Sequence, residues 1–134
     1  MVTDRVRKQQ QELNVHKIQV APDQALAEGF FGAAAALGLG NSELMAILGL
    51  SRSSLGRLKQ SGTIDPRSKT GEIAMLVIRI YRSLVPLNGG DADNIRHFMQ
   101  TYNRHLGGRP VELIQRIDGL ALTCNYLDAL RGAA

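Results

Sequence analysis

Residues 41–62 read NSELMAILGLSRSSLGRLKQSG, and the fold class can be argued from this stretch. Two short apolar-striped segments flank Gly49, and their leucines recur at the spacing of a helix-turn-helix: Leu44, Leu48, Leu50, Leu55 and Leu58. Two helices that cross over a turn of a few residues share a small core, and glycine adopts the positive φ of such a turn at the lowest cost. The stretch therefore predicts a helix-turn-helix with Gly49 at its turn.

The outer face of the second helix is the predicted contact surface for DNA. Asn41 or Ser42 is expected to cap the first helix, Ser51 the second, and Gly62 to end it. With the leucines turned inward, the remaining side chains suit a major groove and its phosphates. The candidate DNA-binding residues are Ser51, Arg52, Ser53, Arg57, Lys59 and Gln60. The alternative is an ordinary pair of surface helices whose serines and arginines are only solvated.

The positive charge of the chain is concentrated around this unit. The 134 residues carry a formal net charge of +4, and residues 42–69 hold a net +3 of it, whereas residues 91–134 contain five basic and five acidic side chains. The basic segment 42–69 suits a nucleic-acid partner, whereas the neutral segment 91–134 suggests that the C-terminal part has another kind of partner. The length suits one compact unit and excludes a large multidomain enzyme.

Helical patterns continue on both sides, with no alternating strand pattern. Residues 1–20 are polar and predicted to be a mobile basic arm, and residues 21–70 are predicted to be the helix-turn-helix domain. Residues 72–85 are apolar on nearly all sides, which requires either a central position or a partner subunit, and we expect a homodimer. The sequence predicts an all-α protein whose residues 71–134 form a second helical domain.

After the 72–85 helix, the C-terminal domain is expected to contain three further helices. The first starts at Asp91 or Asp93 and carries apolar side chains as far as Leu106, before two glycines. The second starts at Pro110 and breaks near Asp118 and Gly119. The third carries Leu120, Cys124, Leu127 and Leu130 and precedes a small flexible end, residues 131–134.

Candidates for catalysis or metal binding are weak. His97 and His105 lie eight residues apart on one predicted helix, too far for the i, i+4 pairing that puts two imidazoles on one metal ion, and Cys124 falls on an apolar stripe. We therefore expect no enzyme activity, cofactor, metal or small-molecule substrate.

The apolar run at residues 73–78 is too short to span a membrane, no leader opens the chain, and a single cysteine suits the cytoplasm.

Residues 98–134 read FMQTYNRHLGGRPVELIQRIDGLALTCNYLDALRGAA, and this string resembles the toxin-binding domain of the MbcA/ParS/Xre antitoxin family. The matching positions are Asn103, Leu106, Gly107, Pro110, Leu113, Gly119, Tyr126, Leu127 and Leu130. An aromatic residue, often tryptophan, is expected just before the asparagine, and here it is Tyr102. With the Xre-like helix-turn-helix upstream, the resemblance covers residues 25–134.

The resemblance implies the antitoxin of a type II toxin-antitoxin system. Its expected partner is a RES-domain toxin that destroys NAD⁺, which the antitoxin would silence by covering the active site with its C-terminal helices and tail. The expected toxin-binding residues are Tyr102, Asn103, Arg109, Pro110, Tyr126, Leu130, Arg131, Gly132, Ala133 and Ala134. Such a protein would also repress its own operon by binding operator DNA. The alternative is a stand-alone helix-turn-helix regulator whose C-terminal helices dimerise or sense a small molecule.

Overall fold

The chain is helical, and the all-α prediction is confirmed. The computed structural model describes residues 3–8 and 20–133, with only the backbone of Ala133. Its helices are α2 (Pro22–Ala36), α3 (Asn41–Leu48), α4 (Arg52–Ser61), α5 (Lys69–Leu87), α6 (Ala92–Gln100), α7 (Pro110–Leu113) and α8 (Ile117–Ala133). Residues 3–8 of the predicted arm are helical, and its residues 9–19 lie outside the described part. None of the described helices is long and apolar enough to cross a bilayer.

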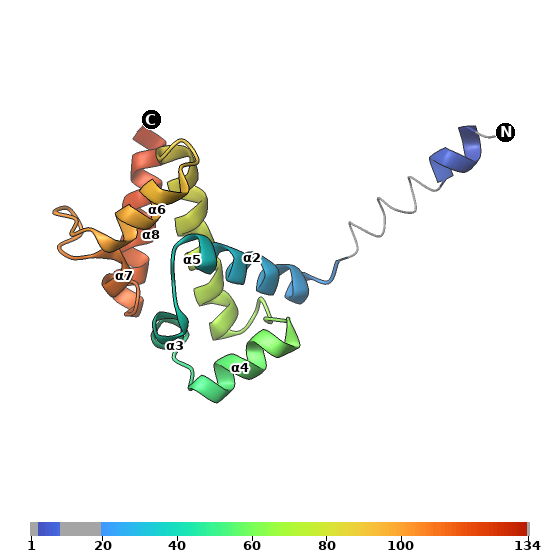
Figure 1. Cartoon of the computed structure of the whole chain (residues 1–134), viewed down its shortest axis with the longest axis horizontal. Coiled ribbons are helices and arrows are strands. Elements are labelled where there is room, and N and C mark those ends of the chain that lie inside the picture. The colour runs from blue at the N-terminus through green and yellow to red at the C-terminus, as the bar shows by residue number, and fades with distance from the viewer. Residues whose placement is uncertain (1–2, 9–19, 134) are drawn as a thin grey trace.

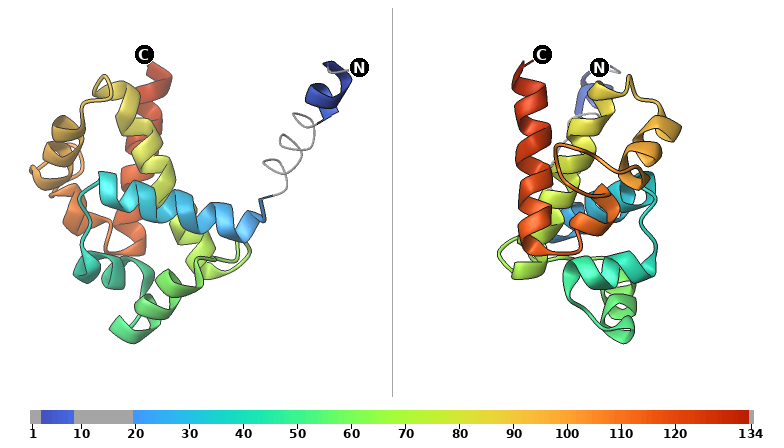
Figure 2. Two further views of the ribbon diagram at one scale, coloured as in Figure 1. Left: turned by 45° about the vertical axis from the view of Figure 1, so that its right-hand side comes forward. Right: turned by 90° about the vertical axis from the view of Figure 1, so that its left-hand side faces the viewer.

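Helix α5 is the central element of the molecule. It packs against α2 and α8, and α8 runs beside it in the same direction (Figure 1, Figure 2). The Cys124 thiol contacts the Leu76 carbonyl oxygen, and Arg79 forms an ion pair with Asp128 further along both helices. This central position buries five of the apolar side chains of residues 72–85 and half-buries four, whereas Met75 remains 53% exposed.

Helices α3 and α4 form the predicted helix-turn-helix at one end of α5 (Figure 1). Gly49 joins them in the left-handed conformation with φ 66°, and the Ser51 hydroxyl caps α4 by accepting a hydrogen bond from the Ser54 N–H at 3.2 Å. The prediction that Asn41 or Ser42 caps α3 is wrong. The helix starts one residue earlier, with Gly40 at the N-cap, and the Asn41 side chain accepts a hydrogen bond from Lys59 instead.

Helix α6 is shorter than predicted, because a local turn replaces its last residues. The helix ends at Gln100, and residues 103–108 form a turn closed by the Asn103 N–H, which donates to the Gly108 carbonyl at 2.9 Å. The Asn103 side-chain oxygen accepts from the backbone N–H groups of His105 and Leu106. Such side-chain bonds to the backbone compete with helix formation. His97 and His105 therefore do not share a helix, and the prediction that they do is wrong.

Helix α8 begins earlier and ends later than predicted. Pro110 opens α7 as expected, but the break falls at residues 114–116, and Gly119 lies in the first turn of α8. A Cβ on Gly119 would lie 2.0 Å from the Leu113 carbonyl oxygen, so this glycine permits close approach of α8 to the end of α7. The helix continues through Ala133, since its last residues are good helix formers apart from Gly132. The predicted flexible end is thus helical over residues 131–133.

Candidate functional site

The first candidate surface is the outer face of α4. All six predicted DNA-binding residues are exposed, as the leucine pattern predicts: Ser51, Arg52, Ser53, Arg57, Lys59 and Gln60. The Arg57 guanidinium donates to the Ser54 hydroxyl at 3.0 Å, and the Ser51 hydroxyl lies 3.2 Å from that of Ser53. These hydrogen bonds hold hydroxyl groups and a guanidinium together near the start of the helix, where an incoming phosphate would find donors.

Lys59 differs from the other predicted DNA contacts. Its ammonium donates to the Asn41 side-chain oxygen at 2.6 Å and lies 6.0 Å from the centroid of the Phe31 ring. The side chain thus links the last turn of α4 to α2 and the first turn of α3. Lys59 therefore ties the helices of the helix-turn-helix together, while its exposed ammonium keeps two further N–H donors that can reach a phosphate.

The second candidate surface joins the 103–108 turn to α8. The ring of His105 stacks on that of Tyr126, with centroids 5.8 Å apart and planes inclined by 23°. Tyr102, just before the turn, is 62% exposed, and Leu130 near the end of α8 is 38% exposed. We call Tyr102, the 103–108 turn, Tyr126 and the exposed residues 130–132 the C-terminal surface. Sequence reasoning missed His105, because it was placed on the face of a longer α6.

Two of the predicted partner contacts, Arg109 and Pro110, also have roles inside the chain. Arg109 donates to the Gln100 carbonyl at 3.0 Å, to the Gln100 side chain at 2.7 Å and to Glu112 at 3.1 Å, and so ties the end of α6 to α7. Pro110 is buried as the first residue of α7. Arg131 and Gly132 are exposed at the end of α8, and Ala134 lies outside the described residues.

Cys124 lies in the interface between α5 and α8. Its thiol is buried and donates to the Leu76 carbonyl oxygen at 3.2 Å. Burial raises the pKa of the thiol from 9.0 to about 11, so the reactive thiolate is scarce at neutral pH. The residue packs as a small apolar side chain, as its stripe predicted. Across residues 3–8 and 20–133, no cluster of three or more His, Cys, Asp and Glu side chains is placed to hold a metal ion.

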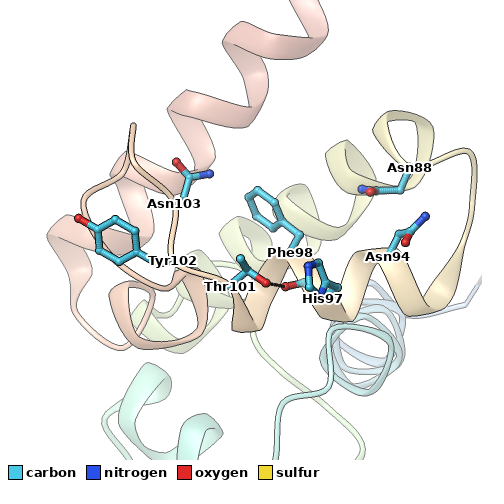
Figure 3. A pocket seen from close by; sticks show the side chains of 7 residues that line it. All are labelled: Asn88, Asn94, His97, Phe98, Thr101, Tyr102 and Asn103. Carbon is cyan, nitrogen blue, oxygen red and sulfur yellow. Dashed lines mark hydrogen bonds between the residues drawn. The ribbon is translucent and has the colours of Figure 1, made fainter.

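A cavity of about 270 Å³ lies beside α6, and we call it the α6 pocket. Its lining residues are Asn88, Asn94, His97, Phe98, Thr101, Tyr102 and Asn103. Figure 3 shows the Phe98 ring between Asn103 on one side and Asn88 and Asn94 on the other. The Thr101 hydroxyl donates to the His97 carbonyl at 2.6 Å and fixes the end of α6 at the pocket. The pocket adjoins the C-terminal surface through Tyr102 and Asn103.

Comparison with known families assigns both halves of the chain. Residues 83–133 match the antitoxin Xre/MbcA/ParS C-terminal toxin-binding domain, and residues 16–79 match the antitoxin Xre-like helix-turn-helix domain. The chain belongs to the Xre/MbcA/ParS antitoxin family. No curated protein matches this antitoxin significantly.

The two domains of the antitoxin meet inside one helix. The first match ends at residue 79 and the second starts at residue 83, and both positions lie within α5. Helix α5 packs against α2 and α3 of the first match and along α8 of the second. The antitoxin therefore has no linker between its two candidate surfaces, and a continuous helix holds them together.

Proposed function

We propose that the antitoxin neutralises an NAD⁺-degrading RES-domain toxin by covering the toxin's active site with the C-terminal surface. The proposal rests on one observation above all. The segment that matches the toxin-binding domain is also the segment that presents Tyr102, half-buried Tyr126 and Leu130 at the molecular surface. Aromatic side chains at a surface are frequent anchors of protein interfaces. The antitoxin then acts by binding, without catalysis of its own.

The end of α8 is the proposed element that enters the mouth of the toxin. Because residues 131–133 continue the helix, the entering element is a narrow helix end that carries exposed Arg131. A guanidinium forms paired hydrogen bonds with carboxylates, so Arg131 could bind acidic side chains at the mouth of the toxin. An ordered end also loses less conformational entropy on binding than a flexible one.

The exposed face of α4 is the proposed operator-binding surface. Arg52, Ser53, Arg57 and Gln60 face solvent on the second helix of the helix-turn-helix, where such proteins read a major groove. The net positive charge of residues 42–69 supports attraction to phosphates. Binding there would repress the operon that encodes the antitoxin and its toxin.

We also propose that the antitoxin is a cytoplasmic homodimer. Met75 on α5 and Leu122 on α8 are 53% and 48% exposed, and covering them would remove apolar area from water. A two-fold dimer would present two α4 helices to a palindromic operator. Sedimentation of the purified chain measures this directly, and a monomer at micromolar concentration would contradict the dimer.

Co-expression tests the main proposal. The RES-domain toxin encoded beside the antitoxin is expressed alone, with the antitoxin, or with a chain that ends after Leu130 and keeps the buried part of α8. We expect growth to stop with the toxin alone, to resume with the full antitoxin, and to resume less fully with the shortened chain, since its toxin-binding surface is incomplete. Recovery of a toxin-antitoxin complex from the rescued cells would support the proposal. Failure of the full antitoxin to restore growth would contradict it and favour a stand-alone regulator.

A further inference from the structure

The α6 pocket offers hydrogen-bonding groups of both kinds, fixed by bonds within the chain. The Asn103 side-chain oxygen is used by two backbone N–H groups, which leaves its amide nitrogen as a donor. Asn88 donates through its side-chain nitrogen to the Leu84 carbonyl oxygen at 2.9 Å, which leaves its oxygen as an acceptor. Figure 3 shows the amide nitrogen of Asn103 on the side of Phe98. A donor and an acceptor thus flank an aromatic ring.

The lining selects an uncharged group. None of the lining residues is an Asp, Glu, Lys or Arg, so a charged group placed there would find no carboxylate, ammonium or guanidinium to pair with. A phenol or a carboxamide both donates and accepts, and an apolar body would pack on Phe98. The chemistry therefore fits a tyrosine, glutamine or asparagine side chain.

The position of the pocket points to the toxin as the molecule whose side chain would occupy it. All the lining residues fall within the segment matched by the toxin-binding domain, and Tyr102 and Asn103 belong to both the pocket and the C-terminal surface. Resting on the function proposed above, we propose that the α6 pocket receives one uncharged, hydrogen-bonding side chain of the toxin. The pocket then anchors the toxin beside the place where the end of α8 covers the active site.

Two substitutions test the pocket from different directions. Asn94→Trp places a large side chain at an exposed lining position of α6 and fills the space. Asn103→Asp keeps the oxygen that accepts from His105 and Leu106, but replaces the donor nitrogen with a charged oxygen. The matched control is Ala92→Trp, which adds the same side chain to an exposed position of α6 outside the pocket lining.

The measurement is the affinity of each full-length variant for the toxin, by titration calorimetry. We expect Asn94→Trp and Asn103→Asp each to weaken binding about tenfold or more, as for an interface anchor, and Ala92→Trp to bind as wild type. Thermal unfolding of each variant, and its oligomeric state by sedimentation, are measured alongside. Weakened binding with unchanged unfolding and oligomeric state would support the proposal.

Other outcomes overturn it in distinguishable ways. Wild-type affinity in both pocket variants would show that the toxin leaves the pocket empty, while the proposed function stands. Tighter binding by Asn103→Asp would show that the occupant is a cation. A changed oligomeric state with unchanged toxin affinity would assign the pocket to a second copy of the chain. If the wild-type antitoxin itself did not bind the toxin, the proposed function would fail and the pocket proposal with it.

Discussion

The imidazole of His105 stacks on the phenol ring of Tyr126 and fastens the 103–108 turn to α8. Replacing His105 with Ala removes this contact and frees the turn, and we expect it to weaken toxin binding by about 1 kcal/mol, the typical value of an aromatic pair. His105→Phe keeps an aromatic ring and is expected to bind within about twofold of wild type. Calorimetric titration with the toxin checks both, and equal affinity of wild type and His105→Ala would refute a role for the stack.

Gly119 permits the contact between the start of α8 and the end of α7. In Gly119→Ala the new Cβ would lie 2.0 Å from the backbone oxygen of Leu113, which cannot yield as a flexible side chain can. We expect a loss of roughly 1–3 kcal/mol in unfolding free energy. Gly32→Ala is the control, because Gly32 is an exposed position of α2 whose Cβ would meet nothing within 4 Å, and we expect about 0.4–1 kcal/mol of stabilisation. Equal stability of both variants, by chemical denaturation, would be inconsistent with this packing.

The buried thiol of Cys124 links stability to alkaline pH. Since its pKa is raised to about 11 in the folded chain, the folded state retains a proton that the unfolded state loses above pH 9. The resulting stability is fully present below pH 9 and is lost as pH rises toward 11. The unfolding free energy, measured by chemical denaturation at several pH values between 9 and 11, should fall more steeply with pH for wild type than for Cys124→Ala. An equal fall in both proteins would argue against a buried thiol. Rapid alkylation of the native protein at pH 7 would argue against it as well.

Arg52 and Lys59 are expected to contribute differently to operator binding. Arg52 is exposed on α4, and we expect Arg52→Ala to cost roughly 1–3 kcal/mol of operator discrimination if the side chain reads a base edge. Lys59→Ala removes an ammonium that is bonded to Asn41, so we expect a smaller loss, equal for specific and unrelated DNA. Binding assays on both DNAs distinguish the effects. Unchanged discrimination in Arg52→Ala would remove its base-reading role.

Sequence patterns predicted the helix-turn-helix well because its determinants are local. Gly49 is needed for the left-handed turn, Ser51 supplies the cap of α4, and Leu55 is buried as the spacing requires. The same reasoning failed for Asn41. Its side-chain oxygen could accept either from a backbone N–H at the start of α3 or from a side chain of another helix, and it accepts from Lys59 of α4. Statistical preferences for helix starts do not include such a tertiary contact.

The C-terminal surface was harder to predict because its contacts join distant residues. The apolar pattern of α6 continues to Leu106, but the side chain of Asn103 stabilises a turn that no periodicity indicates. The stack of His105 on Tyr126 depends on that turn and was therefore missed. Gly119 was taken for a helix breaker, whereas tertiary packing on Leu113 requires it.

The most direct test of the account is NAD⁺ consumption by the purified RES-domain toxin in the presence of the antitoxin. The full-length chain is added in increasing amounts, and a chain ending after Leu130 is added in parallel, with thermal unfolding to confirm that both are folded. We predict that the full chain stops NAD⁺ loss at stoichiometric amounts and that the shortened chain inhibits more weakly, since it lacks the end of α8. Undiminished NAD⁺ consumption with excess full-length antitoxin would contradict the central claim.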